Sequence, residues 1–135
     1  MDIEGAFSTR EDARAILVVD DDPQVLKWVC KMLASTGVQA IHSALSGDEA
    51  MEIWESHRGE IGVLVTDFVM PGITGDYLAM RLLQDKPDLR VLIMSGNDPN
   101  SLDSALPLQS GDNFLQKPFT VAEIQKSIQN LALAE

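Results

Sequence analysis

The sequence is poor in cysteine and contains no long apolar run. Its single cysteine, Cys30, excludes an internal disulfide, so we expect a reducing, cytoplasmic location. No apolar stretch reaches the roughly 18 to 20 residues that span a bilayer. Residues 1–13 carry mixed charges and lack the apolar centre of a signal peptide, so they are expected to form a flexible leader.

Basic residues are also scarce. The chain has 10 Lys and Arg against 21 Asp and Glu, which gives a formal net charge of −11. Such a surface repels phosphate backbones and anionic lipids, so direct binding to nucleic acid or membrane is not expected. The length of 135 residues suits one domain that buries its own core, and we assign residues 14–135 to it.

Short apolar runs that suit buried strands alternate with helical patterns. Helices are expected between and after the runs, and the helix in 97–111 should be short because that segment contains two prolines. Five strands and five helices in this order predict an α/β fold, a single doubly wound parallel sheet with helices on both faces. The expected strand order is the flavodoxin-like 2-1-3-4-5, one of the two common orders of such sheets. The expected strands are 15–19, 38–42, 61–66, 90–94 and 113–116.

Local signals mark several helix ends. Asp22 followed by Pro23 is typical of a helix start, and Gly37 of a helix end. Ser46 and Thr120 each have a glutamate three residues later, which is the spacing of a capping box.

Polar residues follow the strands at the sheet edge where ligands bind in doubly wound folds. Clustered carboxylates repel one another, and Mg²⁺ relieves that conflict because it takes carboxylate oxygens and leaves positions for phosphate oxygens. A lysine can neutralise further charge, while a hydroxyl and a backbone N–H can bind a phosphoryl oxygen. The residues concerned are Asp20, Asp21, Asp22, Asp67, Ser95, Gly96 and Lys117.

Four segments together resemble the receiver domain of two-component signalling proteins. They are 16–23, 63–72, 91–96 and 114–119, within a resemblance that covers about residues 14–133. The segments 94–97 and 115–120 are similar to receivers of hybrid histidine kinases. No output domain fits after the last helix, so we expect a stand-alone receiver or a piece of a longer chain.

The resemblance implies a phosphoacceptor signalling switch rather than an enzyme acting on other substrates. Asp67 would be the nucleophile that takes a phosphoryl group from a phosphohistidine of a histidine kinase or histidine phosphotransfer protein. Mg²⁺ would be bound by Asp21 directly, by Asp20 directly or through water, by Asp67, and by the backbone carbonyl of Val69.

The same resemblance implies which residues would bind the phosphoryl group and change conformation in response. Ser95 would be the switch hydroxyl and Phe114 the switch aromatic. Ser95, Gly96 and Lys117 would contact the phosphoryl group, and the Lys117–Pro118 peptide bond would be cis, since cis bonds are almost confined to X–Pro.

Two alternatives remain open. The Asp20-x-Asp22 pair also fits haloacid-dehalogenase-like phosphatases, with Asp20 as nucleophile, but that interpretation leaves the segment 67–72 unexplained. The other alternative is a receiver-shaped interaction module that no longer takes phosphate, although such forms usually lack an acidic residue or the lysine that this chain keeps.

The remaining prominent side chains are given structural roles. Trp28 is expected to pack against the core, with an exposed partner contact as the alternative, and Trp54 is expected to be half-buried. Cys30 reads as a small helix hydrophobe. His42 and His57 have no metal-ligand partner at a sensible spacing, and no role is assigned to them.

Overall fold

The computed structural model describes residues 15–38, 40–57 and 59–133, and these form a five-stranded parallel sheet of order β2-β1-β3-β4-β5. The predicted fold class and strand order are confirmed. The predicted leader, residues 1–13, lies outside the described residues. The strands are β1 Ala15–Val19, β2 Ala40–Ala44, β3 Ile61–Asp67, β4 Arg90–Ser95 and β5 Phe114–Gln116.

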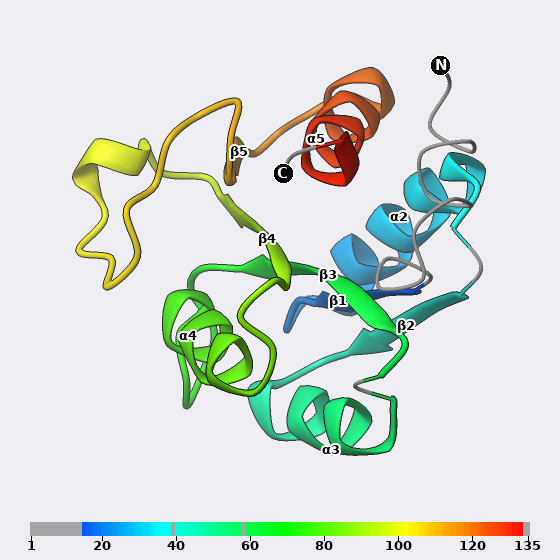
Figure 1. Ribbon diagram of the computed structural model, residues 1–135. Coiled ribbons are helices and arrows are strands. Elements are labelled where there is room, and N and C mark those ends of the chain that lie inside the picture. The colour runs from blue at the N-terminus through cyan, green and yellow to red at the C-terminus, as the bar shows by residue number, and fades with distance from the viewer. Residues whose placement is uncertain (1–14, 39, 58, 134–135) are drawn as a thin grey trace.

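Helices cover both faces of the sheet, with α2 and α5 on one side and α3 and α4 on the other (Figure 1). Alternate residues of β1 supply the two cores: Ile16 and Val18 lie in the cluster under α2 and α5, and Leu17 and Val19 in the cluster under α3 and α4. Because both faces are buried, the strand is apolar throughout. The helices are α2 Pro23–Leu33, α3 Gly47–His57, α4 Gly75–Asp85 and α5 Val121–Leu133, with 3₁₀ turns η2 Ala34–Thr36 and η3 Pro99–Ser101.

The predicted helix ends are confirmed where a side chain or a glycine sets them. The Asp22 carboxylate accepts the N–H of Gln24 at 2.9 Å at the start of α2. At α5, Thr120 and Glu123 accept each other's backbone N–H at 3.1 and 2.9 Å. Gly37 closes η2 with a φ of 83°, a left-handed conformation that glycine adopts without strain.

The prediction of five helices is wrong for the described residues, which form four α-helices. Between β4 and β5 there is only the short turn η3. Prolines limit helical hydrogen bonding in this segment, and Asp98 uses its side chain to accept the N–H of Asn100 at 2.8 Å. The segment is fastened to α4 instead, because Asp76 accepts the N–H of Ala105 at 2.8 Å.

Strand β2 begins two residues later than predicted. Its register is set by its parallel partner, with Ala15 opposite Ala40 and Val19 opposite Ala44. Val38, the first residue of the predicted strand, precedes this pairing.

Both tryptophans differ from expectation. Trp54 is fully buried rather than half-buried, and its Nε1–H donates to Asp85 Oδ2 at 2.9 Å. Trp28 is 54% exposed rather than packed in the core. The buried stripe of α2 consists of Leu26, Val29 and Leu33, and Trp28 lies outside it.

We predict that Trp54→Phe lowers the free energy of unfolding by about 1–3 kcal/mol, because it removes buried volume and leaves Asp85 without its indole donor. Trp28→Phe, at an exposed position of the same residue type, should change it by less than about 0.5 kcal/mol. Urea unfolding followed by far-ultraviolet circular dichroism measures both. Equal losses in the two variants would contradict the assigned role of Trp54.

Candidate functional site

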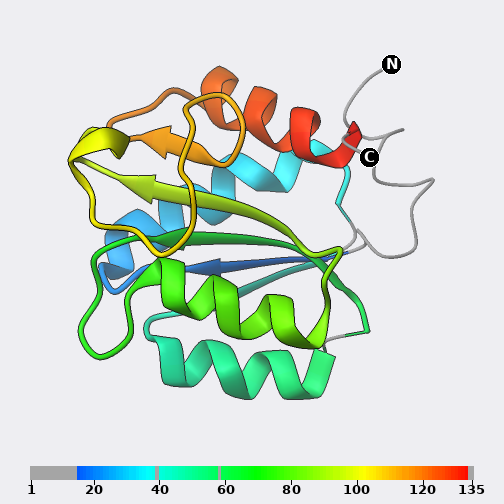
Figure 2. The same ribbon diagram turned by 60° about the vertical axis from the view of Figure 1, so that its left-hand side comes forward.

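Three carboxylates gather at the carboxyl edge of the sheet. Figure 2 shows the strand ends pointing to one side, where the connecting loops meet. Asp20 and Asp21 follow β1 directly, and Asp67 is the last residue of β3. One oxygen from each carboxylate lies within 4.8 Å of the others. The predicted convergence is therefore present, with Asp20 buried, Asp67 half-buried and Asp21 exposed.

Lys117, which directly follows the edge strand β5, completes this cluster. Its Nζ lies 3.0 Å from Asp20 Oδ2 and 3.2 Å from Asp67 Oδ1. Its backbone N–H donates to the carbonyl of Ser95 at 2.8 Å, which continues the β4–β5 pairing past the end of β5. The Lys117–Pro118 peptide bond is cis, as predicted.

The surroundings of Asp67 disfavour its charged form. Burial raises the pKa of Asp67; the charge of Lys117 opposes this, and Asp20 and Asp21 add to it. For Lys117, burial alone would lower the pKa, but the hydrogen bond to Asp20 and the charges of Asp67 and Asp20 outweigh burial and raise it. Three carboxylates share one ammonium, so the site retains negative charge and favours a further cation.

The donor set suits Mg²⁺. Carboxylate oxygens are the hard ligands that this ion prefers, and Asp21 is exposed enough to offer one without breaking an internal contact. Asp20 is already committed to Lys117 and to the N–H of Asp22, which it accepts at 2.9 Å. Within this cluster, Asp21 and Asp67 are thus the most accessible carboxylate ligands.

The other predicted site residues lie in β4, in β5 and in the segments that follow β3 and β4. Ser95 ends β4 and is buried, and its hydroxyl accepts the N–H of Asn97 at 3.1 Å. Gly96 follows it and is exposed. Val69, two residues after Asp67, is 60% exposed. Phe114 lies in β5, opposite Ile93, and its ring is buried in the core under α3 and α4.

Gly75 is a positioning residue that the sequence-based prediction missed. Its N–H donates to the carbonyl of Phe68 at 2.8 Å, which closes the loop after Asp67. A Cβ at this position would collide with the carbonyl oxygen of Asp67. A glycine at the start of a helix, directly after the loop that follows Asp67, was the available signal.

The geometry weighs against the phosphatase alternative. That alternative needs Asp22 as an acid or base, but the Asp22 carboxylate caps α2 by accepting backbone N–H groups. It also makes Asp20 the nucleophile, whereas Asp20 is 1% exposed and paired with Lys117. Asp67 is the more accessible of the two carboxylates.

A doubly wound parallel sheet with an acidic cluster and a lysine at its carboxyl edge defines a receiver-type phosphoacceptor module. The response regulator receiver domain family matches residues 16–129, and the chain belongs to this family.

Curated relatives carry such a module within longer proteins. The sensor kinase CckA of Brucella abortus is 32% identical over 116 residues, which are 86% of this chain and 12% of the kinase. The heme response regulator HssR of Staphylococcus aureus is 32% identical over 108 residues, 80% of this chain and 46% of the regulator. The chain therefore spans less than half the length of either relative.

Solved structures share the fold. A response regulator receiver protein from Sinorhizobium medicae matches with a TM-score of 0.76 and 26% identity, covering 90% of this chain and 96% of that chain. The receiver domain of the hybrid histidine kinase CckA matches with a TM-score of 0.71 and 26% identity, covering 87% and 98%. In the described part of the chain, no helix has the length and apolar character needed to cross a membrane.

We predict that Asp67→Asn stabilises the metal-free chain at neutral pH. The folded chain binds the Asp67 proton more tightly than the unfolded chain does, so the contribution of Asp67 to the stability of the parent falls as pH rises from 3.8 through the raised folded pKa. The gain should shrink as pH is lowered toward 3.8. Urea unfolding in EDTA at several pH values measures it, and a difference that does not change with pH would contradict the electrostatic cause.

Proposed function

We propose that this chain is a phosphorylation switch that takes a phosphoryl group from a phosphohistidine onto Asp67, with Mg²⁺ as cofactor. The donor would be a histidine kinase or a histidine phosphotransfer protein. The carrying observation is the cluster of Asp20, Asp21, Asp67 and Lys117 at the carboxyl edge of the sheet.

Asp67 can take the phosphoryl group because its carboxylate is more accessible than that of Asp20. A carboxylate oxygen of Asp67 attacks phosphorus, an O–P bond forms, and the N–P bond breaks with its electron pair left on the imidazole nitrogen. Lys117, whose Nζ lies 3.2 Å from Asp67 Oδ1, is placed to contact a phosphoryl oxygen. Asp20, Asp21, Asp67 and the Val69 carbonyl would hold Mg²⁺, which supplies positive charge to the phosphoryl oxygens.

The signal would be read through β4 and β5. The Ser95 hydroxyl and the Gly96 N–H would bind phosphoryl oxygens, and the Ser95 hydroxyl would then give up the N–H of Asn97 that it now accepts. Phe114, on the neighbouring strand, would move into the space behind Ser95. The phosphoryl group can shift this equilibrium only by its own preference for the active state.

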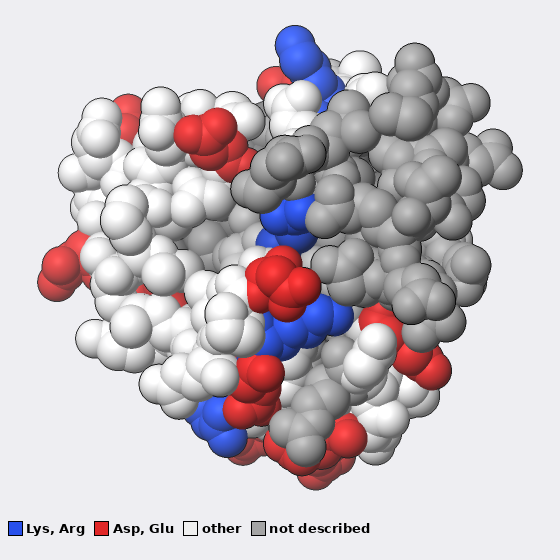
Figure 3. Space-filling view, viewed as in Figure 1, with Lys and Arg blue, Asp and Glu red and all other residues white. Residues whose placement is uncertain are grey.

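The partner is proposed to be a protein rather than a nucleic acid or a membrane, and the location cytoplasmic. The net charge of −11 disfavours binding to phosphate backbones and anionic lipids, and the single Cys30 fits a reducing compartment. On the described part of the face in Figure 3, the blue basic areas are small and lie beside red acidic ones. The likeness to the receiver of CckA supports the further proposal that this receiver acts within a hybrid histidine kinase.

We predict that acetyl phosphate with Mg²⁺ labels Asp67 alone, because Asp67 is the accessible carboxylate beside Lys117. Mass spectrometry of the intact chain should show one added phosphoryl group, which Asp67→Asn and EDTA each abolish. Asp22→Asn is the matched control and should keep the label. Undiminished labelling of Asp67→Asn, or labelling at Asp20, would overturn the assignment and revive the phosphatase alternative.

A further prediction concerns the lifetime of the acyl phosphate. Hydrolysis needs a water aligned opposite the Asp67 oxygen, and the exposed Val69 side chain should exclude water there without orienting it. Val69→Asn should therefore speed dephosphorylation, by about tenfold if the barrier falls by about 1.4 kcal/mol. The decay of the phosphorylated chain in Mg²⁺ measures it. If Val69→Asn decays at the parent rate or more slowly, Val69 does not control hydrolysis.

A further inference from the structure

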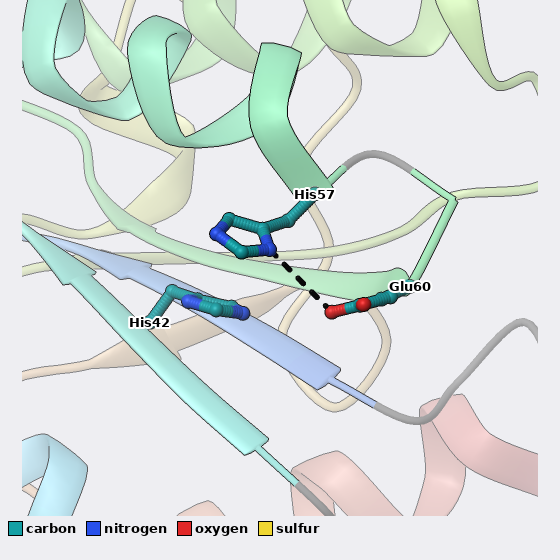
Figure 4. Close-up of side chains that lie close together, drawn as sticks. All are labelled: His42, His57 and Glu60. Atoms are coloured by element: carbon teal, nitrogen blue, oxygen red, sulfur yellow. Dashed lines mark ion pairs between the residues drawn. The ribbon is translucent and has the colours of Figure 1, made fainter.

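The two histidines of the chain lie together, although nothing in their sequence spacing indicated it. His42 is in β2, His57 is the last residue of α3, and Glu60 directly precedes β3. The two imidazole centroids are 4.3 Å apart and the rings are inclined by 26°. Figure 4 shows the stacked rings with the Glu60 carboxylate beside them. The sequence spacing assigned no role to either histidine, and the fold brings both of them beside Glu60.

A tight turn brings the glutamate to the rings. The Glu60 N–H donates to the carbonyl of His57 at 2.8 Å, so the two side chains leave the same side of the turn. Glu60 Oε2 then lies 3.5 Å from His57 Nδ1. The backbone hydrogen bond fixes the place of Glu60 in the turn, while its side chain is 53% exposed and can turn toward a bound ion.

His42 presents an unsatisfied nitrogen to this cluster. Its Nε2 is buried and has no hydrogen-bond partner among the described residues. A buried polar atom without a partner is costly, and a bound ion would satisfy it. Burial, followed by the nearby His57, lowers the pKa of His42, with Glu60 opposing, and the neutral imidazole is the form that binds metals.

We propose that His42, His57 and Glu60 form a second metal site, for a divalent first-row transition ion of the Zn²⁺ type. One ligand atom from each residue already lies within 4.8 Å of the others. Bonds of about 2.0–2.1 Å in a tetrahedral site place ligand atoms about 3.4 Å apart. The two imidazoles must also turn out of their stack, because an imidazole binds a metal in the plane of its own ring. The side chains of His57 and Glu60 are 40% and 53% exposed, which leaves them room to turn, and water takes the fourth position.

This site is distinct from the acidic cluster in both place and chemistry. Glu60 precedes β3 and Asp67 ends it, and a seven-residue strand separates the two sites by about 20 Å. Two imidazoles with one carboxylate suit Zn²⁺, whereas an all-oxygen cluster suits Mg²⁺. A bound ion would tie the edge strand β2 to the end of α3 and the turn before β3.

The test is titration of the untagged chain with zinc chloride in a non-chelating buffer. Because the chain has only two histidines, both sets of imidazole resonances can be followed by nuclear magnetic resonance. One ion per chain should shift both sets, and excess Mg²⁺ should shift neither. A Cys30→Ser, Asp21→Asn, Asp67→Asn background removes the thiol and weakens the acidic cluster, and it should bind zinc at the same place.

His42→Gln and His57→Gln should each weaken zinc binding by at least about tenfold, since even residues that only support a ligand commonly contribute that much. Glu60→Gln should weaken it as well. The partly exposed His57 position keeps the test valid if His42→Gln unfolds, which circular dichroism would reveal. Zinc that shifts neither imidazole, zinc affinity unchanged by His57→Gln, or no zinc binding at all would overturn the proposal. Labelling of Asp67 by acetyl phosphate should be retained in His57→Gln, which separates the two sites.

Discussion

The ammonium of Lys117, held between Asp20 and Asp67, is the interaction on which the rest of the functional edge depends. It joins the ends of β1, β3 and β5, strands that are distant in the sequence and adjacent or nearly so in the sheet. Without it, buried Asp20 would carry an uncompensated charge, which is among the costliest arrangements in a protein. The doubly wound topology matters functionally because it brings these charges together.

One ammonium does not neutralise three carboxylates, and this imbalance links stability to chemistry. The pKa of Asp67 is raised because burial and its acidic neighbours outweigh Lys117. The same residual charge attracts a divalent cation, and whatever binds the folded chain in preference to the unfolded chain also stabilises it. A cation that binds there would therefore restore stability that the raised pKa of Asp67 removes from the metal-free chain.

The sequence was informative where a residue's role follows from its own neighbours along the chain. Continuous apolar runs predicted strands buried on both faces, and the rule for carboxyl ends then placed Asp20, Asp67 and Lys117 together. Helix caps such as Asp22 were equally local. Side-chain burial was not predictable in this way, because Trp28 and Trp54 differ only in what other elements of the fold place beside them.

The two edges of the sheet also differ in how far the sequence predicts the residues that meet there. The carboxyl edge of a parallel sheet is a known site of ligands, so polar residues there are recognised from their position alone. No equivalent rule covers the amino-terminal side, where His42, His57 and Glu60 come together only because α3 returns across the edge strand β2 and turns tightly into β3. The two sites would also differ in the ion that they bind, because imidazole nitrogen favours Zn²⁺ and carboxylate oxygen favours Mg²⁺. A single small sheet can thus offer two chemically different sites, of which only the one at the carboxyl edge is predictable from the sequence.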